Sequence, residues 1–435
     1  MESSQCIFSN FSYVDPEKGE IQCGVSMVVN KGKIQKIQQD PIPATDHIPE
    51  IDLKGQYVIP GLINNHVHLS GSGTPMPKFL DRPILFAWLR KQPWFQRFIQ
   101  KSMRNNAYAS LKKGITSVRS LGEAYFNILE IRDKIKSGEL IGPRLFTSGK
   151  IIAKRGEHID VFDVQINDEI AEATEITEYL VRQGVDCIKV LSTGGVTGAK
   201  ELGQAGKPLF SIEVLKAIVN TAHKAGLRVT AHAEGLEGAR RCVEAGIDSI
   251  EHGADYTEDI LNKMKEKNIG TIPTLSSGLA YSLSDAKLTH IEYLNSIRID
   301  REVEIGLRRA IKRGIIIGVG DDAGIPLVLH GKLAQEIILL HETYGLTPME
   351  AIQCATINNA IILGEEENIG SLNPGKYADF IVFRENPLED LYLLFNPFQV
   401  FKNGVDVCRR RETRLLRYWN RTVKWLDRLF SKQKK

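Results

Sequence analysis

Two histidines separated by one residue, His66 and His68, follow an apolar run that begins at Val58. Side chains two positions apart on a β-strand point to the same face of the sheet. The two imidazoles can therefore be directed at one point, which is what a chelating pair for zinc or a similar borderline metal requires. Two unrelated histidines at the end of a strand would give the same pattern, so this motif alone leaves the metal site open.

Further residues that could ligate a metal come later, each within or directly after an apolar segment. A histidine can instead be a hydrogen-bonded core residue, and an aspartate can instead cap a helix. A lysine in a strand buried on both faces is harder to explain, because an unpaired ammonium is costly to bury. The coincidence of all these residues at strand positions favours a metal centre. The residues concerned are Lys189, His232, His252 and Asp322.

The elements that must position these residues alternate regularly. From about residue 102, amphipathic helical stretches that end at glycine are followed by short apolar strands. Together with the strand before His66 this makes eight strands, which predicts an α/β fold of the (β/α)8 TIM-barrel type. Such barrels carry their catalytic groups at the carboxyl ends of the strands, although a doubly wound sheet has the same alternation. The later strands are predicted at 115–119, 144–148, 185–191, 227–232, 247–252, 271–275 and 315–322.

The two terminal segments have a different character. Residues 1–57 contain two strand-like stretches around the turn Asn30-Lys31-Gly32, and residues 366–408 return to strand character after the last helical repeat. We predict that these segments pack together as a small β-sandwich beside a barrel formed by residues 58–365. Residues 409–435 are predicted to form a basic amphipathic helix, with 11 Lys or Arg against 2 Asp or Glu.

Composition sets the expected partners and compartment. The net charge of the 435 residues is only +3, and we expect no nucleic-acid partner. The six cysteines are scattered without a CxxC pair, and the chain shows neither a signal-peptide pattern nor an apolar run of membrane-spanning length. We expect a cytoplasmic homo-oligomer. The basic segment 409–435 could bind an anionic membrane surface, a neighbouring subunit or the barrel itself.

The order of these motifs resembles that of the amidohydrolase superfamily. Within it, the closest likeness is to the branch of prolidase-like metal-dependent dipeptidases and imidazolonepropionase-like enzymes, and it covers about residues 20 to 405. The resemblance rests on Pro60-Gly61-Leu62-Ile63-Asn64-Asn65-His66-Val67-His68, Ile188-Lys189-Val190 with Gly194-Gly195, Ala231-His232-Ala233-Glu234-Gly235, Ser249-Ile250-Glu251-His252-Gly253, Asp322-Ala323-Gly324 and Gly370-Ser371-Leu372-Asn373-Pro374-Gly375-Lys376-Tyr377-Ala378-Asp379.

The resemblance implies two divalent metal ions, most plausibly zinc. One would be held by His66, His68 and Asp322, and the other by His232 and His252. A carbamate formed from CO₂ on Lys189 would bridge them and would also remove the problem of a buried ammonium.

The resemblance also implies a reaction. A hydroxide held between the metals would attack the amide bond of a small substrate, a dipeptide of the Xaa-Pro type or an N-acyl amino acid. Asp322 would take the proton of the hydroxide and pass it to the leaving amine. His158 matches a family histidine near the substrate.

Three positions depart from the family pattern. Many members have Asp where this chain has Asn64, many dipeptidase relatives have a second histidine where it has Glu234, and relatives have Thr or Ser where it has Asp321. Asp321 is thus a rival to Asp322 as the metal ligand. Glu234 could contact a cationic substrate group or tune His232.

Other readings of the sequence remain open. Arg155 could bind a substrate carboxylate, although arginines are more often surface charges. A mononuclear cyclic amidase or deaminase would use much of the same ligand set, but such enzymes usually lack the bridging lysine found here as Lys189. A metal-free scaffold or binding protein on the same fold is the third reading, and it would have no need to keep all six ligand-type residues.

Overall fold

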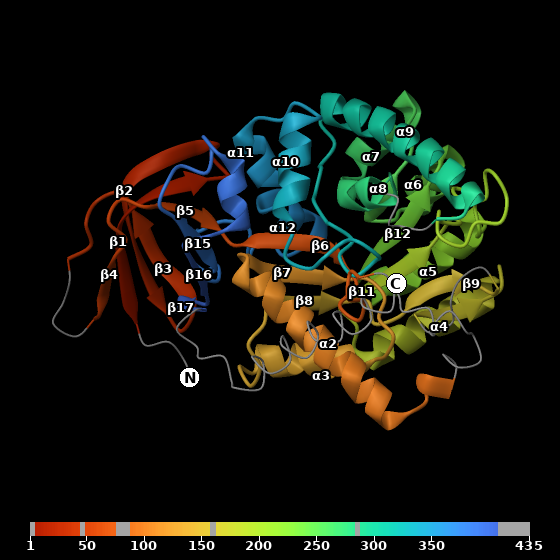
Figure 1. Cartoon of the computed structure of the whole chain (residues 1–435), viewed down its shortest axis with the longest axis horizontal. Coiled ribbons are helices and arrows are strands. Elements are labelled where there is room, and N and C mark those ends of the chain that lie inside the picture. Colours follow the sequence, from red (N-terminus) through yellow and green to blue (C-terminus); the bar gives the residue numbers. More distant parts are fainter. Residues whose placement is uncertain (1–4, 44–47, 75–87, 157–161, 283–287, 408–435) are drawn as a thin grey trace, which may run out of the picture.

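The computed structural model describes residues 5–43, 48–74, 88–156, 162–282 and 288–407 (Figure 1). Its strands are β1 (Cys6–Asp15), β2 (Glu20–Asn30), β3 (Lys33–Gln38), β4 (Glu50–Asp52), β5 (Tyr57–Pro60), β6 (Leu62–Val67), β7 (Ile115–Ser120), β8 (Arg144–Thr147), β9 (Ile151–Lys154), β10 (Asp163–Ile166), β11 (Cys187–Leu191), β12 (Arg228–Glu234), β13 (Ser249–Gly253), β14 (Gly270–Ile272), β15 (Phe380–Phe383), β16 (Gln399–Lys402) and β17 (Val405–Asp406).

The helices fall between the strands, as the alternating pattern predicts. Helices α2 and α3 lie below the central strands in Figure 1, and α9 and α10 lie above them. The helices are α2 (Pro93–Lys112), α3 (Asn127–Lys136), α4 (Ile170–Gln183), α5 (Ile212–Lys224), α6 (Leu236–Ala245), α7 (Glu258–Glu266), α8 (Leu275–Ser282), α9 (His290–Arg313), α10 (Ala334–Glu342), α11 (Pro348–Cys354), α12 (Ile357–Leu363) and the 3-10 helix η3 (Leu391–Phe395).

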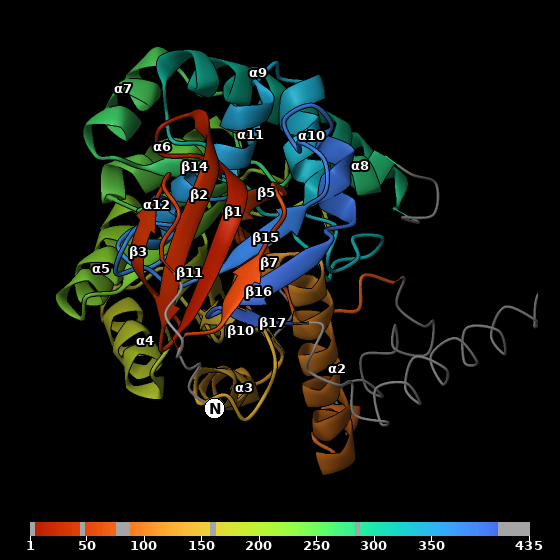
Figure 2. The ribbon, with the colours of Figure 1, turned by 90° about the vertical axis from the view of Figure 1, so that its left-hand side faces the viewer.

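Strands from both ends of the chain form one sheet, which we call the terminal sheet. Its order is β17-β16-β15-β5-β1-β2-β3, with β4 added beside β1 to make eight strands. Figure 2 shows the early strands β1 and β5 next to the late strands β15 and β16. The predicted association of the two termini is confirmed, but they share a single hydrogen-bonded sheet, so the predicted two-sheet sandwich is not established by the strand pairing.

The central strands form two sheets and not one closed ladder. A six-stranded sheet has the order β10-β9-β11-β12-β13-β14, and a three-stranded sheet has the order β6-β7-β8. The two are joined near Thr147, whose carbonyl accepts the N–H of Asp186 at 2.8 Å and whose N–H donates to the Asp186 carboxylate at 2.9 Å. The predicted α/β alternation is therefore confirmed, whereas a closed eight-stranded barrel is not.

The eighth predicted strand, residues 315–322, lies between β14 and β6, where the N–H of Gly318 donates to the carbonyl of Thr271 at 2.9 Å and the N–H of Asn65 donates to the carbonyl of Val319 at 3.1 Å. It makes only isolated bridges, one between Thr271 and Ile317 and one just after it between Val67 and Ala323. The amide of Asn359 in α12 adds to these backbone bonds. Its side chain accepts from the N–H of Val319 at 3.0 Å and donates to the Val319 carbonyl at 2.8 Å.

The chain crosses from the terminal sheet into the central strands at Gly61. This residue separates β5 from β6, and its N–H donates to the carbonyl of Asp379 at 2.8 Å. A Cβ atom at this position would lie 2.0 Å from the hydroxyl oxygen of Thr116, so only glycine fits. The glycine fixes where β6 begins and therefore where His66 and His68 lie.

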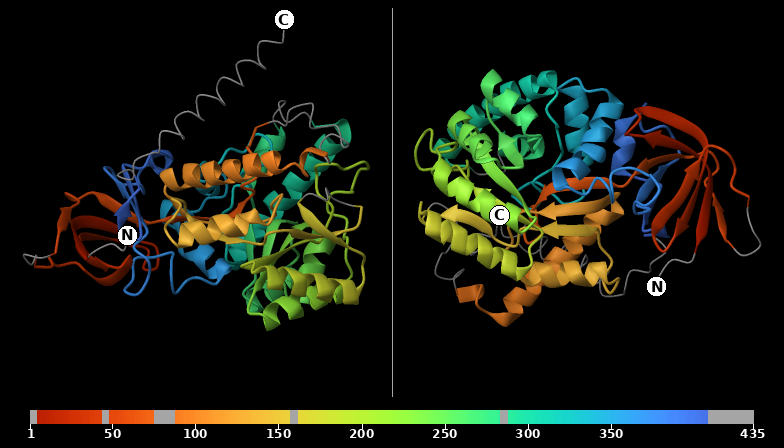
Figure 3. Two further views of the ribbon diagram at one scale, coloured as in Figure 1. Left: turned by 90° about the horizontal axis from the view of Figure 1, so that it is seen from below. Right: turned by 180° about the vertical axis from the view of Figure 1, so that it is seen from behind.

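The two largest hydrophobic clusters among the described residues lie in different parts of the fold. The larger one lies between the central strands and the helices, and the smaller one belongs to the terminal sheet, where Phe8, Phe380 and Phe401 pack with ring centroids 4.5 to 5.2 Å apart. Figure 3 shows the terminal sheet at one end of the molecule, beside the central strands. The two cores meet where β5 pairs with β15.

In the part of the chain that is described, no helix is both long enough and apolar enough to cross a membrane. The predicted basic helix at 409–435 and the candidate residue His158 lie outside the described residues.

Candidate metal centre

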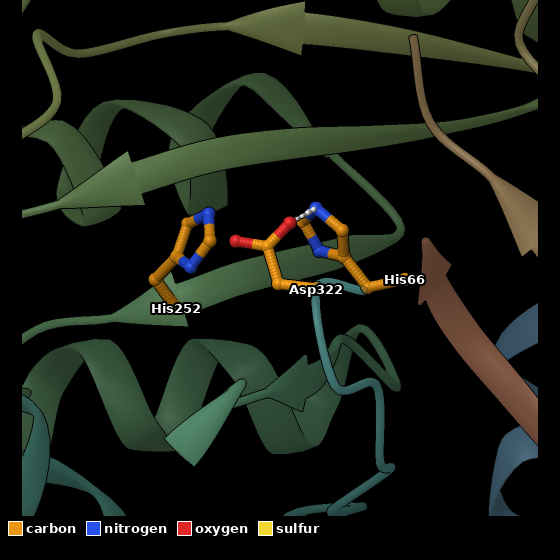
Figure 4. A group of neighbouring side chains, drawn as sticks. All are labelled: His66, His252 and Asp322. Carbon is orange, nitrogen blue, oxygen red and sulfur yellow. Dashed lines mark ion pairs between the residues drawn. The ribbon is translucent and has the colours of Figure 1, made fainter. Parts of the chain in front are cut away.

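The ligand-type residues predicted from the sequence meet at the carboxyl ends of the central strands. We call His66, His68, Lys189, His232, His252 and Asp322 the strand-end cluster. In one group of three, His66, His252 and Asp322, the ligand atoms all lie within 4.8 Å of one another. Figure 4 shows the two imidazoles on either side of the Asp322 carboxylate. A second group, His232, Glu234 and His252, shares His252 with the first.

His66 is held from behind by a carboxylate. Its Nδ1 lies 2.7 Å from Oε2 of Glu251, and because an ionised carboxylate only accepts, Nδ1 carries the hydrogen. Burial lowers the pKa of His66 well below its usual range, and the nearby Lys189 ammonium lowers it further. The ring is therefore neutral, and its Nε2, 3.4 Å from Oδ1 of Asp322, is left with a lone pair for a metal.

His68 is oriented by the backbone instead. Its Nδ1 lies 3.0 Å from the carbonyl of Gly122, which fixes the hydrogen on that nitrogen, and its Nε2 lies 3.2 Å from Oδ1 of Asp322. The buried carboxylate of Glu123 accepts from the N–H of Leu69 at 2.6 Å and of Ser70 at 2.8 Å. The chain just after His68 is thereby held in place.

The two neighbouring aspartates, Asp321 and Asp322, point in different directions. Asp322 faces His66 and His68, and although burial opposes ionisation, these two histidines hold its pKa below its usual value. Asp321 faces the other way, and its Oδ1 accepts from Nδ2 of Asn64 at 2.7 Å and from the N–H of Ala323 at 3.1 Å. Two of the departures from the family pattern, Asn64 and Asp321, are thus hydrogen-bonded to each other.

Lys189 lies in β11 and is only 2% exposed. Its Nζ has no hydrogen-bond partner among the described residues. Burial lowers its pKa from 10.5 to about 8, against the opposing attraction of the Glu251 and Asp322 carboxylates. A buried amine without a partner is costly, so a bound group or a chemical change at Nζ would relieve this position.

His232 and His252 complete the cluster from β12 and β13. Their ring centroids are 4.6 Å apart, and Nδ1 of His252 lies 2.7 Å from the hydroxyl oxygen of Thr274. Burial lowers the pKa of His252 well below its usual range, so this ring is also neutral. The backbones of His252 and Asp322 adopt left-handed conformations, with φ of 68° and 55°. Such strain in residues other than glycine is concentrated at functional sites.

A buried ion pair beneath the cluster was not predicted. Arg119 donates from Nη2 to Oε1 of Glu251 at 2.7 Å and from Nε to the carbonyl of Asn65 at 2.8 Å, and the hydroxyl of Thr230 also bonds Glu251. The guanidinium is buried and bonds the same Glu251 carboxylate that holds Nδ1 of His66, so it supports His66 through Glu251. The sequence did contain a sign of this pair, because Arg119 and Glu251 are charged residues inside predicted buried strands, as Lys189 is.

The remaining candidate residues lie at different depths. Glu234 is 6% exposed at the end of β12, and its Oε2 lies 3.9 Å from Nε2 of His232. Burial, and then the nearby Asp300, raise the pKa of Glu234 to about 8. The side chain of Arg155 is 60% exposed and lies 4.0 Å from Glu172, so the structure does not bring it into the strand-end cluster.

The donor set fits divalent metal ions. It combines four imidazoles, two of which, His66 and His252, are kept neutral by burial, with an ionised carboxylate and a buried amine that has no described partner. Imidazole with carboxylate is a usual ligand set for zinc and its neighbours. The cluster also lies at the carboxyl ends of the central strands, where α/β-barrel enzymes carry their catalytic groups.

Comparison with known proteins identifies the family. Residues 57–407 match the model of the Amidohydrolase family, so the chain belongs to this family of hydrolases, whose members generally use divalent metal ions. The predicted family resemblance is confirmed.

Three similar proteins illustrate the likeness. The chain is 28% identical over 331 residues to an ochratoxinase of Aspergillus niger, which covers 69% of this chain and 67% of that protein. It is 25% identical over 396 residues to an imidazolonepropionase of Acinetobacter baumannii, with 85% and 90% covered. The crystal structure of a Xaa-Pro dipeptidase with methionine bound in its active site superposes with a TM-score of 0.79 at 28% identity, over 93% of this chain and 99% of that one.

Proposed function

We propose that this protein hydrolyses the amide bond of a small substrate, a dipeptide of the Xaa-Pro type or an N-acyl amino acid, with the strand-end cluster as its metal centre. The observation that carries the proposal is Lys189, an almost fully buried amine without a described partner amid neutral histidines. Similarity to a Xaa-Pro dipeptidase and to an ochratoxinase supports the substrate class.

The residues divide into two ligand sets around Lys189. His66, His68 and Asp322 would hold one ion and His232 and His252 the other, and zinc is the ion that this donor set suits best. When bound, divalent ions supply a nucleophilic hydroxide at neutral pH and withdraw electrons from the scissile carbonyl.

Lys189 is suited to become a carbamate. Addition of CO₂ requires the neutral amine, which forms a new N–C bond and releases one proton. A pKa of about 8 leaves a sizeable neutral fraction near pH 7.5, whereas an ordinary lysine is almost fully protonated there. The resulting carboxylate would place two oxygen ligands at the position where Nζ now has no described partner.

Asp322 is suited to move the proton. Its carboxyl is ionised at neutral pH because His66 and His68 lower its pKa, so it can accept a proton and later return it to the leaving amine. Its strained backbone and the hydrogen bond of its N–H to the carbonyl of His66, 2.9 Å long, fix the carboxylate beside the histidines. We place His158 near the substrate on family resemblance alone.

The test is metal analysis of protein purified with bicarbonate and without chelator. We expect about two equivalents of divalent metal per chain, reduced in Lys189→Ala and unchanged in Lys216→Ala, an exposed lysine on α5. Turnover is then assayed with Xaa-Pro dipeptides and N-acyl amino acids. About one equivalent with no effect of Lys189→Ala would favour a mononuclear enzyme, and no bound metal after reconstitution would reject the proposal.

We further propose that residues 58–365 act as one barrel-type catalytic domain, with residues 1–57 and 366–408 as its β-sandwich appendage, and that the chain assembles as a homo-oligomer. The segment 409–435, with 11 Lys or Arg against 2 Asp or Glu, is proposed to bind an anionic membrane surface. Deleting it should abolish sedimentation with phosphatidylserine vesicles while amide hydrolysis is retained. Equal vesicle binding by both proteins would reject this role.

A further inference from the structure

A cavity of about 340 Å³ opens directly beside His252. The cavity runs between α8 and α9. The first residue of α8, Leu275, is held by Glu336 of α10, whose carboxylate accepts from the N–H of Leu275 at 3.0 Å. Apolar side chains form much of the cavity wall. They are Val196, Leu275, Leu279, Ile299, Val303 and Leu339.

Three acidic side chains line this cavity. Its described lining includes the carboxylates of Glu234, Asp300 and Glu304, and no Lys or Arg is among the described lining residues. Acidic residues alone do not define a ligand site, so the burial and the hydrogen-bond partners of each carboxylate must be considered.

Glu234 is the buried member of this set. It is 6% exposed, it lines the cavity, and its Oε2 has no hydrogen-bond partner in the described part of the chain. Nε2 of His232 lies 3.9 Å from that oxygen, which is beyond hydrogen-bond distance. A buried carboxylate oxygen in this position calls for a donor, and the cavity is where a donor can enter.

Asp300 supplies a second carboxylate farther along α9. Glu304, one helical turn later, is already engaged by Nη2 of Arg308 at 3.1 Å. No hydrogen bond or ion pair joins the Asp300 carboxylate to another described residue, so its charge is available to a ligand in the cavity. Asp300 is also close enough to Glu234 for its charge to raise the pKa of that group.

We propose that this cavity binds a cationic group on an aliphatic stem, such as the side chain of lysine or arginine in the substrate. The apolar walls fit the methylene stem, and Glu234 and Asp300 fit the charged end. A substrate carboxylate would be repelled here by the Asp300 carboxylate, which has no partner among the described residues. The inference rests on the proposed amide hydrolysis and narrows its substrate class to amides with a basic side chain.

Binding is tested on the metal-loaded full-length protein with two probes of nearly equal shape. n-Butylguanidinium is a cation that cannot ligate a metal through a lone pair, and n-butylurea is its neutral counterpart. By calorimetry we expect the cation to bind about tenfold or more tightly than the urea. Asp300→Asn and Glu234→Gln should each reduce this preference several-fold, and Glu213→Gln, an exposed carboxylate on α5, should leave it unchanged.

A kinetic comparison separates this inference from the proposed function. Dipeptides with lysine at either position are compared with the same dipeptides containing norleucine, and we expect a higher kcat/KM for a lysine peptide. Hydrolysis without any preference for the cation, or a preference that survives Asp300→Asn, overturns the cationic subsite and leaves the hydrolase proposal standing. A binding preference without hydrolysis of any peptide supports the subsite and counts against the hydrolase proposal. Metal content is measured in Glu234→Gln, and if metal is lost, Asp300→Asn alone decides.

Discussion

The strand-end cluster and the core of the terminal sheet are both buried, but the first consists of polar and charged side chains and the second of apolar ones. In the terminal sheet, Phe380 and Phe401 stack with centroids 4.5 Å apart and ring planes 11° apart, and Phe8 meets both edge-on. Such contacts favour folding by removing apolar surface from water. In the strand-end cluster, polar and charged groups take the place of apolar ones, and Lys189 has no described hydrogen-bond partner.

The difference fits a stabilising role for the terminal sheet and the proposed chemical role for the strand-end cluster. His252 and Asp322 hold left-handed backbone conformations, and Lys189 carries a charge that burial opposes. These features destabilise the fold unless something compensates for them. A bound metal and a modified lysine would do so, and the surrounding apolar core supplies the remaining stability.

The sharpest way to break the comparison is to replace Lys189. We expect Lys189→Ala to lower kcat by roughly a thousandfold or more and to reduce the metal content, because a shared ligand of the cluster is lost. The variant should still fold, as judged by circular dichroism. A variant that keeps most of its activity would show that Lys189 is an ordinary buried lysine and that the cluster works without it.

The terminal sheet should respond in the opposite way. Phe380→Ala removes a fully buried ring that stacks on Phe401 and is expected to lower the free energy of unfolding by about 3–5 kcal/mol. Below its melting temperature, the folded variant should keep its kcat, because the ring lies in the smaller core and not in the strand-end cluster. Denaturant titration and turnover on the same sample check both parts. A large fall in kcat at full folding would mean that the two regions are coupled.

The positions of single residues could be predicted from the sequence, because strand ends follow from local pattern. The glycines that end α4, α6 and α9 and the apolar runs after them located Lys189, His252 and Asp322. The family pattern was needed to choose Asp322 over Asp321, and the side-chain directions agree with that choice.

What the sequence could not provide were pairs of residues far apart in the chain. Asn64 and Asp321 are 257 positions apart, and Arg119 and Glu251 are 132 apart, so no local pattern links them. The support of residues 315–322 has the same origin, because the amide of Asn359 reaches the backbone of Val319, 40 positions away. A charged residue in a buried strand indicates that it has a partner, but only the folded structure shows which residue that partner is.

The pH dependence of stability also distinguishes the strand-end cluster from the terminal sheet, because the cluster contains Lys189, a buried lysine with a lowered pKa. In metal-free protein, the pKa of Lys189 is about 8 when folded and 10.5 when unfolded. The unfolded chain therefore binds the proton more tightly, and below pH 8 the full cost of the buried ammonium is present. At ~1.4 kcal/mol per pH unit, stability should rise by about 3 kcal/mol between pH 8 and 10.5.

Lys189→Met is the matched control, because it keeps the stem and removes the amine. Its stability in the metal-free state should lack this rise, and at pH 7 the variant should be more stable than the native chain. Urea titrations at several pH values in the presence of chelator measure the difference between the two proteins. Parallel curves for both would mean that the Lys189 ammonium is accommodated at no cost.

The smallest expected effect on stability and activity comes from changes to the pair Asn64 and Asp321. The two single substitutions should differ in size. Asn64→Asp alone would place two carboxylates where Nδ2 and Oδ1 now lie 2.7 Å apart, and we expect a loss of about 2 kcal/mol in stability and roughly tenfold in kcat/KM. Asp321→Asn alone should cost less than about 1 kcal/mol, because the new amide oxygen can still accept from Asn64 and from the N–H of Ala323.

The double variant Asn64→Asp with Asp321→Asn exchanges donor and acceptor and should recover most of the loss. Its carboxylate at position 64 can still accept the N–H of His66, which now bonds Oδ1 of Asn64 at 3.2 Å. The coupling energy from the four proteins should be at least about 1 kcal/mol in the direction of rescue. Additive losses would mean that each residue acts separately. In that case the residue types at positions 64 and 321 would matter independently. The hydrogen bond between Asn64 and Asp321 would then not be needed to hold Asp322 beside His66.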